Sequence, residues 1–219
     1  MRVRRPHRYW ICLLTLSILS LFLLKPDLWR ERRANTGEEM SVMISMLRGV
    51  NVGGNNKIKM TELKALYESL GFTDVQTYIQ SGNVVFKSSA KDSATLGKKI
   101  GTAIEKKCGF CPEVIVRTPE ELREVIARNP FSKRKDIEPG KLLVMFLAAD
   151  PGDAARKTLK SVEAPVEEIK PLGKEIYIYF PGGQGQSKLK FAQIDKAINK
   201  TAWTGRNWNT VLKLAEMCD

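Results

Sequence analysis

Apolar and polar residues alternate along residues 43–131 in a way that predicts strands and helices in turn. Val42–Leu47 is an apolar run of strand length, and Thr61–Leu70 places its large apolar residues on one face of a helix that Gly71 ends. Two β-branched runs meet at Gln80-Ser81-Gly82 and predict a hairpin. The further predicted elements of this half are strands at 74–79, 83–87 and 114–116, a helix at 93–107, and a helix that starts at Thr118.

Residues 132–219 repeat much of this order after a charged segment, 132–140, which marks the predicted internal boundary. The predicted elements are a strand at 142–147, a helix at 151–162, hairpin strands at 166–170 and 175–180, and helices at 189–199 and 208–217. The last helix stands where the first half has its final strand. We therefore expect the second half to lack that strand.

The order β-α-β-β-α-β is that of the split-βαβ, ferredoxin-like motif, an open sheet with helices on one face. We therefore expect an α+β protein made of two ferredoxin-like half-domains. The predicted halves are residues 43–131 and 132–219, each an open sheet covered by helices.

Residues 1–42 form a separate N-terminal segment. Arginines precede an apolar run at 9–24, as in a signal peptide, and the run is shorter than the ~20 residues that cross a bilayer comfortably. Three interpretations stay open: a signal-like segment, a membrane anchor, and an artefact of a start codon upstream of Met43. We expect residues 43–219 in the cytoplasm, anchored to a membrane through residues 9–24 only if that segment is translated and retained.

Composition narrows the chemistry of residues 43–219. The net charge of the whole chain, +12, favours nucleic acid or phosphorylated ligands, although a solvated lysine-rich surface explains it equally well. The only histidine is His7, which excludes histidine acid–base catalysis and Ser-His-Asp triads from this part. A lone C-x-x-C at Cys108 and Cys111 gives no complete zinc ligand set. We expect no metal and no cofactor.

The clearest candidate for a ligand site is the segment Arg48–Asn56, which joins a predicted strand to a predicted helix. Its glycines and asparagines tolerate positive φ, and backbone N–H groups in such a loop can bind phosphate or carboxylate, with a guanidinium as the fixed charge. A long turning connection explains the pattern equally well. The candidate ligand-binding residues here are Arg48, Asn51, Gly53, Gly54 and Asn55.

Two other loops carry candidate ligand residues. Gln80, Ser81 and Asn83 offer amides and a hydroxyl at the hairpin, where they are also good turn residues. The predicted topology places this hairpin at the opposite end of the sheet from Arg48–Asn56. Lys188 ends a second glycine-rich segment, 181–188, which lacks the Walker order but has the composition of an anion nest or of a flexible connection.

A third group of candidates lies near the C-terminus, where Arg206, Asn207 and Trp208 follow Trp203. Tryptophan and arginine can stack on a base and bind phosphate, which suggests a nucleic-acid platform. The alternative is structural: both tryptophans anchor the core, and Asn207 caps the last helix.

Four motifs together resemble a known family. They are Leu47-Arg48-Gly49-Val50-Asn51-Val52-Gly53-Gly54, Tyr78-Ile79-Gln80-Ser81-Gly82-Asn83-Val84, Asn129-Pro130-Phe131 and Thr204-Gly205-Arg206-Asn207-Trp208-Asn209-Thr210-Val211. Over about residues 43–218 the chain is similar to the uncharacterised bacterial domain-of-unknown-function family 1697. The resemblance implies a soluble, cytoplasmic α/β domain with two ferredoxin-like halves and no established activity. It supplies no catalytic residues, and the apolar N-terminus departs from the family's usual pattern.

We expect a protein that binds a small anionic or phosphate-containing ligand at its Gly/Asn-rich loops, with Arg48 and Arg206 as charge partners. Two alternatives stay open. One is a nucleic-acid-binding protein that uses the basic face and the two tryptophans. The other is a histidine-independent enzyme that acts on an anionic substrate by electrostatic stabilisation.

Overall fold

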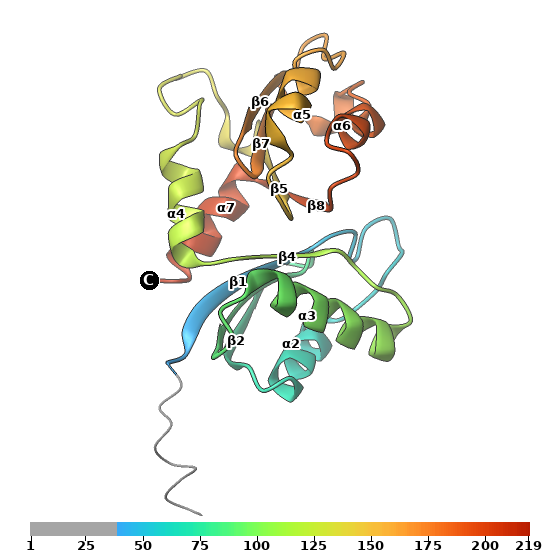
Figure 1. Ribbon diagram of the computed structural model, residues 1–219, viewed down its shortest axis with the longest axis vertical. Coiled ribbons are helices and arrows are strands. Elements are labelled where there is room, and N and C mark those ends of the chain that lie inside the picture. Colours follow the sequence, from blue (N-terminus) through green and yellow to red (C-terminus); the bar gives the residue numbers. More distant parts are fainter. Residues whose placement is uncertain (1–38) are drawn as a thin grey trace, which may run out of the picture. The chain divides into compact units, whose positions relative to one another are not determined.

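Two four-stranded antiparallel sheets carry the fold of residues 39–219, the part of the chain that the computed structural model describes (Figure 1). The apolar run at 9–24 lies outside the described residues, so the expectations for it are not addressed by the structure. Within residues 39–219, no helix combines the length and the apolar character needed to cross a bilayer.

The first sheet has the strand order β2-β3-β1-β4, with every neighbouring pair antiparallel. Its chain order is β-α-β-β-α-β, and a further helix, α4, follows it. The elements are β1 (Ser41–Leu47), α2 (Met60–Ser69), β2 (Thr73–Tyr78), β3 (Asn83–Ser88), α3 (Ser93–Cys108), β4 (Val114–Arg117) and α4 (Pro119–Ala127).

The second sheet repeats this arrangement with the order β6-β7-β5-β8, again antiparallel throughout. Its elements are η1 (Pro139–Lys141), β5 (Leu142–Leu147), α5 (Gly152–Leu159), β6 (Glu168–Leu172), β7 (Glu175–Tyr179), η2 (Gln184–Gln186), α6 (Phe191–Ala197), β8 (Trp203–Asn207) and α7 (Trp208–Glu216). The described residues thus form an α+β fold with two four-stranded sheets and six α-helices.

The expectation that the second half lacks a final strand is wrong. Trp203–Asn207 forms β8, which pairs with β5 over its whole length. Glycine, arginine and asparagine interrupt the β-branched pattern by which a short strand is recognised. Asn207 ends the strand and also caps α7, because its side chain accepts a hydrogen bond from the backbone N–H of Thr210.

Both faces of each sheet are buried, which explains the continuous apolar runs of β1 and β5. One face of the first sheet packs on α2 and α3, and one face of the second packs on α5 and α6. The other two faces share a single core with α4 and α7, in which Ile44, Val144 and Trp208 take part. Figure 1 shows α4 and α7 beside each other where this shared core is closed.

Local sequence features explain where α4 begins and how closely α3 packs on β4. Thr118 and Glu121 form the predicted capping box at the start of α4. In α3, a Cβ atom added to Gly97 would lie 2.6 Å from the carbonyl oxygen of Val114, so the helix approaches β4 at a distance that only glycine permits.

Candidate functional site

The loop after β1 and the hairpin between β2 and β3 lie side by side at one end of the first sheet. The Asn51 side chain donates from Nδ2 to the carbonyl oxygen of Gln80 at 2.9 Å, and the Leu47 N–H donates to Gly82 at 2.9 Å. The expectation that these two loops occupy opposite ends of the sheet is therefore wrong. Because β3 lies between β1 and β2 and is antiparallel to both, β1 ends at the same end of the sheet as the turn between β2 and β3.

Asn51 organises the loop after β1. Its backbone adopts a left-handed φ of 55°, and its side chain donates to the Ile58 carbonyl at 2.9 Å and accepts from the Ile58 N–H at 3.0 Å. A second asparagine, Asn56, donates from Nδ2 to the Gly49 carbonyl at 3.1 Å. These contacts close the base of the loop and leave Val52–Asn55 as a projecting turn with exposed residues.

A surface hollow of about 530 Å³, here called the α2 hollow, lies between this turn and the start of α2. It is lined by Asn51, Gly54, Lys57, Ile58, Lys59, Glu62 and Gln80. Three predicted ligand residues, Asn51, Gly54 and Gln80, are thus brought together. Gly53 and Asn55 belong to the same exposed turn but do not line the hollow.

The α2 hollow has a positive electrostatic character at its rim. Helix α2 starts without a side-chain cap, so no side chain satisfies its first backbone N–H groups. Lys57 forms no ion pair within residues 39–219, and Lys59 pairs only loosely with Glu62, at 3.9 Å. The Glu62 carboxylate opposes this character, since it lies in the first turn of the same helix.

Arg206 lies on the face of β8 that is turned toward the shared core, and it is only 6% exposed. Its guanidinium donates only to protein oxygens. Nη2 donates to the carbonyls of Leu47 at 2.7 Å and Ser81 at 3.0 Å, and Nε donates to Oδ1 of Asn83. Burial lowers the pKa of Arg206 to about 10, so the side chain remains charged at neutral pH. The structure places Arg206 as a link between the two sheets and leaves it no donor for an external anion, contrary to the expectation of a charge partner.

Asn83 is fully buried and uses its amide for the same network. Its Nδ2 donates to the Tyr78 carbonyl and to Oγ of Ser81, both at 3.0 Å, while its oxygen accepts from Arg206. Asn83 and Ser81 therefore shape the hairpin. Neither lines the α2 hollow.

Arg48 takes a different position, over the indole of Trp203. Its Cζ lies 3.9 Å from the ring centroid, and no carboxylate pairs with it within the described residues. On the same indole, Phe191 stacks with a centroid separation of 5.7 Å, and Nε1 of Trp203 donates to Asp195 at 2.5 Å. Arg48 is thus a half-buried cation–π partner that joins the first half to the second.

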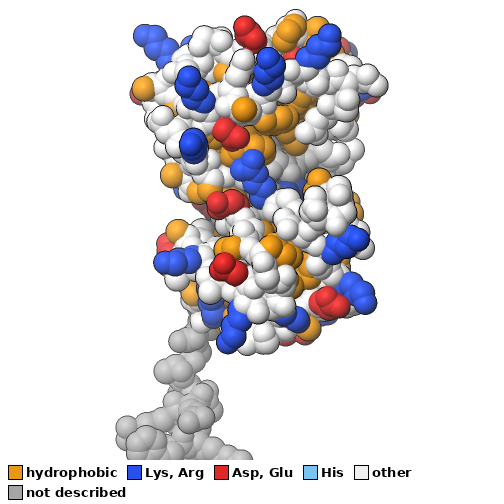
Figure 2. All heavy atoms as spheres, turned by 90° about the vertical axis from the view of Figure 1, so that its right-hand side faces the viewer, with side chains coloured by type: hydrophobic (Ala, Val, Ile, Leu, Met, Phe, Trp, Pro, Cys, Tyr) orange, Lys and Arg blue, Asp and Glu red, His pale blue; other side chains and the backbone are white. Residues whose placement is uncertain are grey.

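The predicted nucleic-acid platform at the C-terminus is not formed. Trp203 and Trp208 are each only 9% exposed and belong to hydrophobic cores, so neither indole offers a free face for a base. Asn207 is the helix cap of the structural alternative. On the face that Figure 2 shows, Lys and Arg side chains are scattered among acidic, apolar and uncharged groups rather than joined in one cationic surface.

The second glycine-rich loop, residues 181–188, does not line the α2 hollow. Lys188 is exposed, and the neighbouring Ser187 hydroxyl donates to the buried Glu167 carboxylate at 2.5 Å. This hydrogen bond lowers the pKa of Glu167, which keeps a negative charge beside the loop and disfavours an anion there.

A family model described as "Protein of unknown function (DUF1697)" matches residues 40–177. The chain belongs to the DUF1697 family. The solved structure of the conserved bacterial protein SP0830 from Streptococcus pneumoniae has a TM-score of 0.59 and 24% identity, covering 82% of this chain and 99% of that one. At that identity the likeness concerns the fold alone. No curated protein matches the chain.

Three of the four motifs that carry the DUF1697 resemblance meet at Arg206. Its guanidinium binds Leu47 of the first motif and Ser81 and Asn83 of the second. The remaining motif forms its own turn, in which Oδ1 of Asn129 accepts from the Phe131 N–H at 2.9 Å. Much of the motif sequence thus serves the contact between the two sheets.

Sequence reasoning missed Lys57, Lys59 and Glu62, which complete the α2 hollow. A usable signal was present: two lysines precede a helix that has no Ser, Thr, Asp or Asn at its cap position. Within residues 39–219 the structure shows no group of three or more metal-ligating side chains, and Cys108 and Cys111 are free thiols.

Proposed function

We propose that this DUF1697 protein binds a small anionic, phosphate-containing ligand in the α2 hollow. The observation that carries the proposal is the uncapped N-terminus of α2 beside a glycine-rich turn and the unpaired Lys57. Backbone N–H groups at a helix start favour anions both as donors and through the helix dipole.

The residues have distinct parts in this proposal. Lys57 and Lys59 supply mobile positive charge, and Gly54 lets a ligand approach the backbone of the turn. Asn51 holds the turn against Gln80 and Ile58, so the hollow is shaped before a ligand enters. Arg48 and Arg206 support the neighbouring framework rather than the ligand.

The strand orders also support a finer description of the fold. We infer that each sheet with its two helices is a ferredoxin-like, split-βαβ half-domain, because β-α-β-β-α-β with a central first and third strand is the arrangement of that motif. The two half-domains would be residues 43–131 and 132–219.

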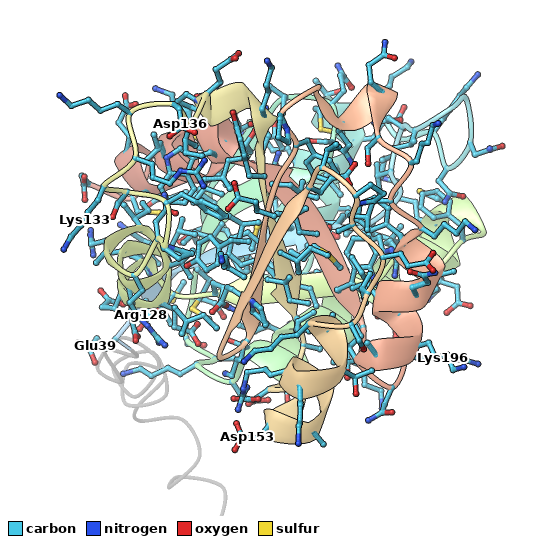
Figure 3. All side chains as sticks on the ribbon, turned by 90° about the horizontal axis from the view of Figure 1, so that it is seen from above. Glu39, Arg128, Lys133, Asp136, Asp153 and Lys196 are labelled. Carbon is cyan, nitrogen blue, oxygen red and sulfur yellow. The ribbon has the colours of Figure 1, made fainter. Side chains whose placement is uncertain are left out.

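The test is a calorimetric titration of the full chain with inorganic pyrophosphate at low and at physiological salt. We expect binding that weakens at least about tenfold in the Lys57→Ala, Lys59→Ala double variant, the equivalent of roughly 1.4 kcal/mol. Lys196→Ala is the matched control, since this exposed lysine points away from the body of the protein in Figure 3.

Two further results decide the proposal. Glu62→Gln should strengthen pyrophosphate binding about two- to fivefold, because a charge near a helix start is worth roughly 0.3–1 kcal/mol. Equal affinity of the wild type and the double lysine variant would contradict the proposed site. Tight binding of single-stranded nucleic acid with a steep salt dependence would favour the alternative.

A further inference from the structure

The two halves of the protein place an arginine at equivalent positions of their last strands. Arg117 in β4 lies opposite Ile44 of β1, and Arg206 in β8 lies opposite Val144 of β5. Each Nη2 reaches across to the carbonyl that ends the first strand of the other half: Arg117 donates to Leu147 and Arg206 to Leu47, both at 2.7 Å. The two contacts are related by the internal repeat.

The side chain that receives each arginine differs between the halves. Asn83 and Glu175 occupy the same place, the first residue of β3 and of β7, opposite Met46 and Phe146 respectively. Arg206 therefore meets a neutral amide, whereas Arg117 donates to the Glu175 carboxylate at 3.1 Å. The side chains of Arg117 and Glu175 are only 4% and 12% exposed.

The loops beside these two arginines also differ. In the first half, the long connection 48–59 joins β1 to α2, whereas the second half has only residues 148–151 between β5 and α5. Next to the shorter loop lies a cavity of about 270 Å³, here called the Glu175 cavity. It opens between α4 and the β6–β7 turn, and Arg128, labelled in Figure 3, lines it at the end of α4.

The Glu175 cavity carries charges of both signs, and most of them are already paired. Arg128 donates to Glu124 at 2.8 Å. Two groups keep free capacity: Oε2 of Glu175 accepts no hydrogen bond within residues 39–219, and Lys174 lies 3.8 Å from Glu121, beyond hydrogen-bond distance. A carboxylate oxygen that no described protein group binds and a loosely paired ammonium group thus stand on adjacent residues that line the cavity.

We propose that the Glu175 cavity binds a small zwitterion of the amino-acid class, with the ligand's ammonium group on Glu175 and its carboxylate on Lys174. A ligand whose charges have one sign would pair with only one of these two groups and would be repelled by the other. The cavity volume lies just below the ~300–1,000 Å³ of typical small-ligand sites, which suits only a molecule of a few heavy atoms.

The test is calorimetry on the full chain with each of the twenty proteinogenic amino acids in turn, and with putrescine and succinate as probes whose charges are all positive or all negative. We expect at least one amino acid to bind at least about tenfold more tightly than either probe. Lys174→Met should weaken that binding at least about tenfold, while Lys170→Met, an exposed lysine on β6, should leave it unchanged.

The Glu175→Gln variant is informative if its thermal unfolding remains cooperative. If it does not, the test rests on Lys174→Met, because Lys174 is half-exposed. No binding of any amino acid at millimolar concentration would overturn the proposal. So would equal binding of putrescine, or a Lys174→Met variant that binds like Lys170→Met. The Lys57→Ala, Lys59→Ala variant should bind the amino acid normally, which separates this site from the α2 hollow.

Discussion

Arg206 donates from Nε to Oδ1 of Asn83, which lies 123 positions earlier in the chain, and this hydrogen bond joins the two sheets. The same guanidinium donates to the carbonyls of Leu47 and Ser81, so one side chain satisfies acceptors on β1 and on the β2–β3 hairpin. Among the predicted site residues, Arg206 is the clearest case of a motif residue that has a structural role.

Loss of this arginine should destabilise the fold strongly. Arg206→Met leaves several buried oxygens without a donor, and we expect the free energy of unfolding to fall by about 3 kcal/mol or more. Urea denaturation of the variant and of Arg123→Met measures the difference. The exposed Arg123 pairs only with surface carboxylates, so its loss should change the free energy of unfolding far less than the loss of Arg206. Similar stabilities of the two variants would contradict the role of Arg206 in linking the two sheets.

Glu175 should make a measurable contribution to the pH dependence of stability. Burial raises its pKa above the ordinary value of 4.5, and the attraction of Arg117 opposes this shift only in part. From pH 4.5 upward to its folded pKa, the native state therefore binds more protons at this site than the unfolded state does. The free energy of unfolding should fall as the pH rises through that window.

The measurement compares the wild type with Glu175→Gln by guanidinium denaturation from about pH 4.5 to pH 7. The stability of the wild type relative to the variant should decline over this range. The nearby Glu121 and Lys174 are present in both proteins, so their direct titration largely cancels in the difference. A difference that stays flat or rises with pH would show that the pKa of Glu175 is not raised.

Gly97 should tolerate no side chain. A Cβ atom there would lie 2.6 Å from a backbone oxygen of Val114, and α3 can yield only by moving away from β4. Gly97→Ala should cost about 1–3 kcal/mol, as overpacking does in other cores. Gly185→Ala meets nothing within 4 Å and serves as the control, with little change in the thermal midpoint.

Asn51 should be needed for the shape of the α2 hollow more than for global stability. Asn51→Gly retains the left-handed backbone but removes the hydrogen bonds to Ile58 and Gln80. We expect pyrophosphate affinity to fall about fivefold or more, a loss of roughly 1 kcal/mol, with faster amide exchange at Ile58. Unchanged exchange at Ile58 would show that the loop does not depend on this side chain.

Hydrophobic periodicity was sufficient to predict most of the helices and strands of the fold. The continuous run Leu142–Leu147 indicated a strand buried on both faces, and Thr118-Pro119-Glu120-Glu121 marked a helix start that the structure confirms. The missed strand, Trp203–Asn207, is short and held by pairing with β5. Such pairing lies far away in sequence, so local pattern does not report it.

The candidate site was harder to predict for a physical reason. Arginine next to asparagine and glycine has the same local sequence whether its guanidinium faces solvent or a buried carbonyl. Arg206 and Asn83 are distant in the chain, and their contact depends on how the two sheets pack. Asn51, Gly54 and Gln80 were predicted as candidates because turn chemistry is local, and Lys57, which lines the same hollow, was missed because a single lysine carries little pattern.

The most direct test of anion binding in the α2 hollow is a two-dimensional amide NMR titration of the isotope-labelled full chain with inorganic pyrophosphate. Saturable shift changes should concentrate at Gly53–Glu62 and Gln80, since these backbone groups surround the hollow and the start of α2. Absence of saturable changes there, or changes confined to Lys188 and its neighbours, would contradict the proposed function.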